Sequence, residues 1–256
     1  MGSGDLEALA KVAAAAADAA RREILPRFRR VAVETKSDGS PVTEADRAAE
    51  RAIRSVLREA NPEIGILGEE YGEEGAAEGR RWLVDPIDGT IAFSRGIPLF
   101  GTLLALLEDG EPVLGLIDLP ALDERTLGFR GGGVRRNGEP VRVSQRAELR
   151  DAIVSHGDPF CFDVFGERPA FERMAREIPL LRGYTDAFGH AQVVSGSVDA
   201  MVDVFCNPWD LAATRALVPE AGGRCVTLDR RDEKKGMGLV FGSPPLVDEL
   251  AGWLSG

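Results

Sequence analysis

The stretch WLVDPIDGTIAF, residues 82–93, contains two acids separated by Pro-Ile and followed by Gly-Thr. The run RRWLVDP at 80–86 predicts a buried strand, so Asp85 and Asp88 stand at its end. A carboxylate pair at a strand end either closes an Asx-type turn or holds something positively charged. Acids elsewhere in the chain help to decide between these two interpretations.

Further acids also stand at the ends of expected elements, where a rigid scaffold positions functional loops. Glu69 and Glu70 follow a short apolar strand. Asp46 lies in the first turn of a helix for which Thr43 is the expected N-cap, and Asp210 opens the helix of WDLAA. Taken one at a time, Asp46 and Asp210 are typical of helix caps, and Glu69 and Glu70 are typical of a solvated loop. Together, such carboxylates would repel one another and raise each other's pKa unless a cation neutralised them.

The acids therefore predict a site for a hard divalent cation. Oxygen-rich sites without nearby His or Cys select cations such as Mg²⁺, which also takes oxygen ligands from substrate phosphates. The chain has two histidines and three cysteines without CxxC spacing, so a zinc site built on these residues is not expected. The scattered cysteines predict reduced thiols and a cytoplasmic protein.

Composition argues against other classes of function. The 256 residues carry a formal net charge of −11, which argues against general binding to nucleic acid or to a membrane surface. No apolar run approaches the roughly 18–20 residues that span a bilayer. The Ala-rich stretch KVAAAAADAA predicts a helix and not a signal peptide. We expect a single domain over 1–256, with two halves at about 1–145 and 146–256.

The order of the expected elements favours a mixed α/β architecture with helices layered on sheets. Asp-Gly and Asn-Gly pairs mark hairpin turns in a meander of strands. Helices are expected at 5–30, 44–60, 169–177, within 181–205, at 209–221 and near the C-terminus, and strands at 64–68, 80–86, 99–129, 131–144, 152–156, at the end of 181–205 and at 238–242.

Three motifs together resemble the signature of a known family. GEE at 68–70, DPIDGT at 85–90 and WDLAATRALVPEAGG at 209–223 occur in the order and spacing of the inositol monophosphatase family, the magnesium-dependent, lithium-sensitive phosphomonoesterases. KSDGSPVTEAD at 36–46 also fits, and the resemblance covers nearly the whole chain. It implies the αβαβα sandwich of inositol monophosphatases and fructose-bisphosphatases.

The resemblance implies two or three Mg²⁺ ions per subunit and a phosphate site beside them. The implied ligands are Glu69, Asp85 and the backbone carbonyl of Ile87 for one ion, Asp85, Asp88 and Asp210 for a second, and Glu70 and Asp46, through water, for a weaker third. Gly89 and Thr90 would contact the phosphate, with backbone N–H groups at a helix start supplying the anion site.

The implied reaction is in-line attack of a metal-activated water on a phosphate monoester. Glu69 and Thr90 would orient or deprotonate that water, and loss of the Asp88 carboxylate would cost turnover. No side-chain nucleophile is expected, and the chain has no GxSxG elbow. Lys36 could close over the site from the segment 35–41, although a plain surface lysine is the simpler interpretation.

The resemblance places the residues that recognise the rest of the substrate in GYTDAF at 183–188, which includes Thr185 and Asp186, and at Asp203, where the family usually has Glu. Inositol enzymes usually have a small residue in place of Asp186, whereas the histidinol-phosphatase branch has Asp. A carboxylate there suits an ammonium group. The alternative is that Asp186 is a helix N-cap, and His190, on the same helix face, is expected to pack.

The preferred substrate is therefore L-histidinol phosphate, with inositol monophosphate as the close alternative. Fructose 1,6-bisphosphate and adenosine 3′,5′-bisphosphate are less favoured. A non-enzymatic alternative is a transcription-associated binding protein, since some bacterial relatives act in transcription. Homodimers are common in the family, and the apolar stretch 98–107 is expected either at an interface or inside a sheet.

Overall fold

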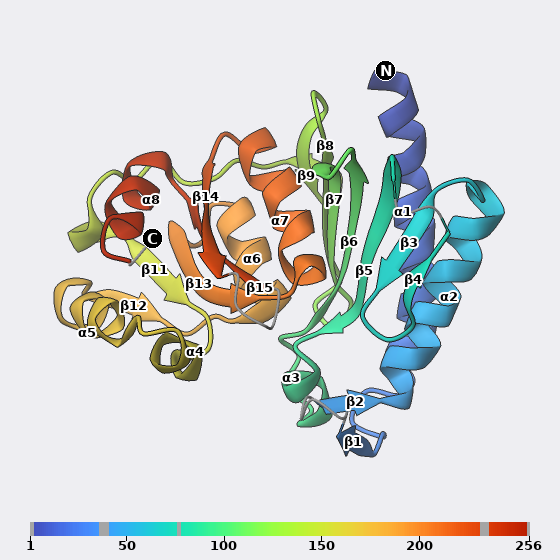
Figure 1. The fold of residues 1–256 in the computed structure, drawn as a ribbon, viewed down its shortest axis with the longest axis horizontal. Helices are drawn as coiled ribbons and strands as arrows, with labels where there is room; N and C mark the ends of the chain where they lie inside the picture. Colours follow the sequence, from blue (N-terminus) through green and yellow to red (C-terminus); the bar gives the residue numbers. More distant parts are fainter. Residues whose placement is uncertain (1–2, 36–40, 76–77, 231–235, 255–256) are drawn as a thin grey trace.

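The computed structural model describes residues 3–35, 41–75, 78–230 and 236–254. Five layers alternate between helix and sheet across the molecule (Figure 1). Helices α1 and α2 cover the outer face of an eight-stranded sheet, α6 and α7 lie between this sheet and a five-stranded one, and α4, α5 and α8 lie beyond the second sheet. The expected αβαβα layering is confirmed.

The first helical layer differs from expectation at one end. α1 (Ser3–Ile24) was expected to run to residue 30, but Pro26 follows two residues after its last residue. Proline lacks an N–H and disfavours helical geometry in the residue before it, so the chain continues in turns. α2 (Glu44–Ala60) begins after Thr43 as expected, with a capping box between Thr43 and Asp46.

The eight-stranded sheet positions the acids of DPIDGT. Its order is β10-β9-β8-β7-β6-β5-β3-β4, and only the β3–β5 pair is parallel. The apolar stretch 98–107 forms part of an inner strand, so the internal-sheet interpretation is confirmed. The strands are β3 (Gly65–Gly68), β4 (Gly72–Glu74), β5 (Arg80–Asp88), β6 (Gly101–Glu108), β7 (Glu111–Leu119), β8 (Glu124–Phe129), β9 (Gly133–Arg136) and β10 (Glu139–Pro140).

The five-stranded sheet has the order β12-β11-β13-β15-β14. Its strands are β11 (Ile153–His156), β12 (Leu180–Arg182), β13 (Ala200–Cys206), β14 (Arg224–Arg230) and β15 (Gly236–Gly242). The remaining elements are the two-stranded pair β1 (Val33–Thr35) and β2 (Pro41–Thr43), α3 (Thr90–Ser94), the 3₁₀ turn η1 (Leu149–Asp151), α4 (Pro159–Val164), α5 (Arg168–Glu177), α6 (Asp186–Val194), α7 (Pro208–Glu220) and α8 (Pro244–Ala251). Of the elements in the two sheets and in this list, α3, α4, η1, β1, β2, β4, β12 and β14 were not expected.

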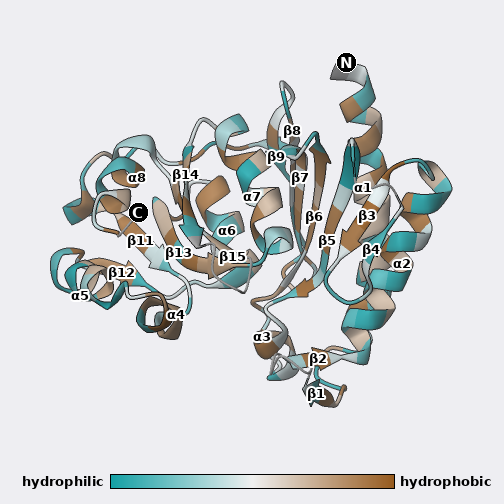
Figure 2. Ribbon diagram, viewed as in Figure 1, coloured by the Kyte–Doolittle hydropathy of each residue, from teal (hydrophilic) through white to brown (hydrophobic). Residues whose placement is uncertain are grey.

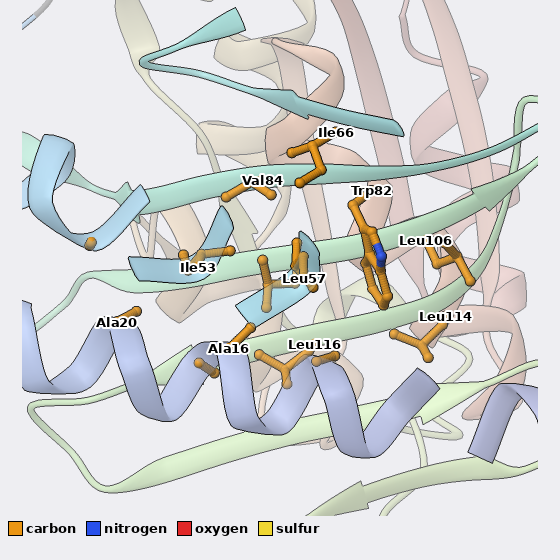
Figure 3. Packing of buried hydrophobic residues seen from close by; sticks show 14 of the residues in the cluster. Ala16, Ala20, Ile53, Leu57, Ile66, Trp82, Val84, Leu106, Leu114 and Leu116 are labelled. Carbon is orange, nitrogen blue, oxygen red and sulfur yellow. The ribbon is translucent and has the colours of Figure 1, made fainter. Parts of the chain in front are cut away.

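Hydrophobic residues make up the buried core, and the ribbon coloured by hydropathy shows hydrophilic residues along the outer sides of α1 and α2 (Figure 2). Ala16 and Ala20 of α1, Ile53 of α2 and the sheet residues Trp82 and Leu116 belong to one buried cluster between the two helices and the eight-stranded sheet (Figure 3). Small alanines bring α1 close to the sheet, and close packing makes the sheet a rigid support. No helix in the described ranges is long and apolar enough to cross a membrane.

Candidate metal centre and substrate cavity

The acids of DPIDGT stand where β5 meets α7. One carboxylate oxygen from each of Asp85, Asp88 and Asp210 lies within 4.8 Å of the other two. Between Asp85 and Asp88 the pairing of β5 with β6 shifts register, a bulge that changes the direction of neighbouring side chains. The backbone N–H of Ile87 donates a 3.0 Å hydrogen bond to Oδ1 of Asp85. The pair therefore closes an Asx-type turn and also joins an acidic cluster.

Asp210 reaches this cluster from the first turn of α7. Oδ2 of Asp210 accepts hydrogen bonds from the backbone N–H and the Nδ2 of Asn207, at 2.7 and 3.3 Å. Asn207 is the N-cap, so the interpretation of Asp210 as the cap is wrong: it is the third helical residue of a capping box. The box fixes one carboxylate oxygen and thereby orients the group toward β5.

The electrostatics of the three aspartates test whether a cation fits. Burial, with a further contribution from the charge on Glu69, raises the pKa of Asp85 well above its usual range. Burial and the charge on Asp186 do the same to the pKa of Asp88, and burial raises the pKa of Asp210 to about 7. Oδ2 of Asp88 is a buried oxygen without a hydrogen-bond partner among the described residues. Mutually repelling carboxylates with a buried oxygen that lacks a hydrogen-bond partner suit a hard divalent cation such as Mg²⁺.

Glu69 lies among these acids at the end of β3. Its backbone N–H donates to the carbonyl oxygen of Val84 at 3.1 Å, which fixes the turn beside β5. Its charge raises the pKa of each of the three cluster aspartates and also that of Asp46. The structure thus brings together four of the expected ligands, Glu69, Asp85, Asp88 and Asp210, from three separate stretches of chain.

A buried glutamate that the sequence analysis missed supports this turn. Oε2 of Glu50 accepts from the backbone N–H of Glu70 at 2.7 Å, and Oε1 accepts from Tyr71 N–H at 3.2 Å and from Nε of Arg54 at 2.8 Å. A Cβ on Gly68 would lie 2.0 Å from Oε1 of Glu50, so only glycine leaves room for the carboxylate. The signal in the sequence was an acid on the buried face of the helix 44–60.

Asp46 and Thr90 meet on the other side of the cluster. Oδ2 of Asp46 accepts from the backbone N–H and the hydroxyl of Thr43, at 2.8 and 2.5 Å. The hydroxyl of Thr90 lies 3.2 Å from Oδ1 of Asp46 and 3.0 Å from the carbonyl oxygen of Ile87. Gly89, with φ of 85°, makes the left-handed turn from which α3 begins at Thr90. The expected phosphate-contact residues thus stand at a helix start.

A cavity of about 130 Å³ opens beside the cluster. Asp88 and Asp210 form part of its wall, and α6, β13 and the loop before α4 supply the remainder. The wall away from the acidic cluster includes Asp158, Asp186, His190, Asp203 and Phe205.

Asp186 lies between the cavity and the phosphate-contact turn. Its Oδ2 accepts from the hydroxyl of Thr185 at 3.0 Å and lies 3.3 Å from the position of a Cβ on Gly89. Asp186 is the first residue of α6, with φ of 57°, and Thr185 is the N-cap, so the cap interpretation of Asp186 is wrong. Burial raises the pKa of Asp186 although the Thr185 hydrogen bond opposes the shift.

Asp203 is held in place by buried polar contacts. Its Oδ2 lies 3.1 Å from Nε2 of His190, whose Nδ1 lies 2.7 Å from the hydroxyl of Thr214. A Cβ on Gly157 would lie 1.8 Å from Oδ1 of Asp203, so the approach of β13 to this loop requires glycine. His190 is 1% exposed, which agrees with the expected packing role, and it also orients a cavity carboxylate.

A model of the inositol monophosphatase family matches residues 5–249. The chain belongs to the inositol monophosphatase family.

Individual known proteins match this chain over most of their own length. Histidinol-phosphatase of Chlorobaculum parvum is 41% identical over 214 residues, which cover 83% of this chain and 82% of that protein. Fructose-1,6-bisphosphatase/inositol-1-monophosphatase of Thermotoga maritima is 42% identical over 212 residues, covering 82% and 80%. Among solved structures, extragenic suppressor protein suhB of Bartonella henselae has a TM-score of 0.88 at 30% identity, covering 96% and 98%.

The cysteines and Lys36 of this inositol monophosphatase family member were also subjects of prediction. No disulfide joins the three cysteines, as expected, and burial raises the pKa of Cys206, which lines the cavity, well above its usual range. Burial therefore disfavours the thiolate, the nucleophilic form of a cysteine. Lys36 lies outside the described residues.

Proposed function

We propose that the chain is a Mg²⁺-dependent phosphomonoesterase whose preferred substrate is L-histidinol phosphate. The observation that carries the substrate assignment is the position of Asp186, beside Gly89 on one side and in the cavity wall on the other. A phosphate bound at Gly89 and Thr90 would extend its alcohol portion past Asp186. A carboxylate at that point would form a charge-assisted hydrogen bond with the ammonium group of histidinol.

In this proposal two or three Mg²⁺ ions are held by the expected ligands. Glu69, Asp85, Asp88, Asp210 and the carbonyl of Ile87 would bind two ions, with Glu70 and Asp46 near a third. When bound, divalent cations supply an activated water and neutralise charge on the phosphate and on the leaving oxygen. The hydroxyl of Thr90, near both Asp46 and the Ile87 carbonyl, would orient the attacking water, and Glu69 would accept its proton. Backbone N–H groups at Gly89 and Thr90 would hold the phosphate.

A phosphate-release assay with Mg²⁺ tests the proposal. Wild-type protein is assayed with histidinol phosphate, inositol 1-phosphate, fructose 1,6-bisphosphate and adenosine 3′,5′-bisphosphate. We expect the highest kcat/KM for histidinol phosphate, and Asp186→Ala should lower it by about 10-fold to 100-fold while sparing inositol 1-phosphate. Equal loss on both substrates, or no loss on histidinol phosphate, would refute the ammonium contact.

Inositol monophosphate is the second candidate, because Asp203 stands where the family usually has a substrate-contacting Glu and lines the same cavity. Its carboxylate could accept hydrogen bonds from a sugar-alcohol hydroxyl as well as from an ammonium group. The same assay separates the two substrates. A cytoplasmic homodimer is part of the proposal, and light scattering after gel filtration tests the oligomeric state.

A further inference from the structure

An aromatic ring interrupts the acidic lining of the cavity. Phe205, two residues beyond Asp203 on β13, is a half-buried cavity residue. A phenyl ring is a ligand for neither a divalent cation nor a phosphate oxygen. Its place beside Asp186, Asp203 and Asp158 therefore needs an explanation beyond the metal centre.

The ring of Phe205 is held in a fixed orientation. It stacks on Phe165, the residue that ends α4, with ring centroids 4.7 Å apart and planes inclined by 13°. On β15, a Cβ on Gly236 would lie 1.9 Å from Cε2 of Phe205, so the backbone there contacts the ring directly. Stacking and this close backbone approach restrict rotation of the side chain, which makes the ring a preorganised surface.

The surroundings of the ring select a particular kind of ligand group. Carboxylates of Asp158, Asp186 and Asp203 line the same cavity, and His190 holds Asp203 in place. A flat group that is partly cationic gains from both features, since it stacks on an aromatic face and donates hydrogen bonds to carboxylates. Imidazole, with a pKa near 6.5, is such a group. Inositol and glycerol offer no flat face.

We propose that Phe205, supported by Phe165, is a specificity-determining residue that stacks on a flat heteroaromatic group at the end of the substrate remote from its phosphate. This inference rests on the proposed phosphatase function and assigns the imidazole of histidinol phosphate to the Phe205 face. Asp186 then receives the ammonium group, and Asp203 or Asp158 accepts a hydrogen bond from a ring N–H.

Two kinetic measurements on the full chain test the role of Phe205. The first compares histidinol phosphate with β-glycerophosphate, which has no ring. Phe205→Ala and Phe205→Leu should each raise KM for histidinol phosphate about fivefold to tenfold, with kcat within about twofold and β-glycerophosphate kinetics unchanged. Phe205→Tyr should keep the wild-type KM. Phe160→Ala, an exposed aromatic of α4, is the matched control and should change neither substrate.

The second measurement uses L-histidinol as a competitive inhibitor of β-glycerophosphate hydrolysis. Its inhibition constant should rise about fivefold to tenfold in Phe205→Ala and Phe205→Leu. An unchanged constant, a Leu variant equal to wild type, or a parallel loss on both substrates would overturn the stacking role. The proposed function fails separately if wild-type protein hydrolyses histidinol phosphate no faster than β-glycerophosphate. The inhibition constant of L-histidinol in the Phe205 variants then still decides whether its imidazole ring binds at Phe205.

Discussion

Oε2 of Glu50 accepts a 2.7 Å hydrogen bond from the backbone N–H of Glu70, which joins the middle of α2 to the turn that carries Glu69. Glu50 is fully buried, and its second oxygen accepts from Tyr71 N–H and from Arg54. The proposed metal ligand Glu69 thereby depends for its position on a helix residue that need not contact any ion. Mutation of such supporting residues typically lowers metal affinity by about 10-fold to 100-fold.

Glu50→Gln tests this support. In the wild-type protein both carboxylate oxygens of Glu50 accept hydrogen bonds. Glutamine keeps one acceptor oxygen and replaces the other with an NH₂ group, which cannot accept, so at least one buried N–H loses its partner. We expect the Mg²⁺ concentration for half-maximal phosphate release to rise about 10-fold to 100-fold. Glu73→Gln, which removes only an exposed ion pair with Arg81, is the matched control. A Glu50 variant with normal Mg²⁺ dependence would show that the turn holds Glu69 without it.

Asp88→Asn removes a charge from the cluster while preserving side-chain shape. Phosphate release should fall by about 10²–10³-fold, because the variant weakens the centre that neutralises charge on the phosphate. In metal-free protein the melting temperature should rise or stay constant, since one repelling, unpartnered carboxylate is gone. Phosphate release and thermal melting of one preparation measure both effects. A near-normal rate would exclude Asp88 from the metal site.

Metal removal should make stability depend on pH in a defined direction. Asp85, Asp88 and Asp210 have raised pKa values in the folded chain, about 7 for Asp210 against an ordinary 3.8. Between these values the folded state holds more protons than the unfolded state, so stability is lost as pH rises from about 4 to 7.

Thermal melting in EDTA at a series of pH values measures this dependence. We expect the melting temperature to fall by about 5–10 °C across the window. Saturating Mg²⁺ should abolish the fall, and its binding should release protons. Identical curves with and without Mg²⁺ would contradict the assignment of these carboxylates to a metal centre.

Gly157→Ala tests the placement of Asp203. The added methyl group would lie 1.8 Å from Oδ1 of Asp203, so the carboxylate must move away from its position beside His190. KM for the preferred substrate should rise about 10-fold, with a smaller change in kcat, because the metal acids are not displaced. Gly4→Ala, where no atom lies within 4 Å of the added group, is the control. Unchanged KM would remove Asp203 from substrate recognition.

The acids that form the centre could be predicted from sequence because each stands at the end of an expected element, and the resemblance to the inositol monophosphatase family joined them into one ligand set. The stretch 85–90 places two carboxylates at one strand end, and Thr43 with Asp46 specifies a capping box within four residues. The hairpin turns could also be predicted from adjacent residues. Asp109-Gly110 and Asn137-Gly138 adopt positive φ, as such turns require. Layering of helices on sheets followed from the order of the elements.

The residues that escaped prediction depend on long-range packing. Glu50 acts through a turn about 20 positions away, and Phe205 acquires its role by stacking on Phe165 across 40 positions. No local pattern distinguishes such a residue from an ordinary polar or apolar one. The first helix does not continue to residue 30, as had been expected, because the proline at position 26 disfavours helical geometry in the residue before it.

Anomalous diffraction from crystals soaked in Mn²⁺, a probe for Mg²⁺, tests the central claim most directly. The account predicts peaks within bonding distance of carboxylate oxygens of Asp85, Asp88 and Asp210, with Asp85 shared between two ions and Glu69 on one of them. A crystal in saturating Mn²⁺ with no peak between these carboxylates would contradict the metal centre and the phosphatase mechanism built on it.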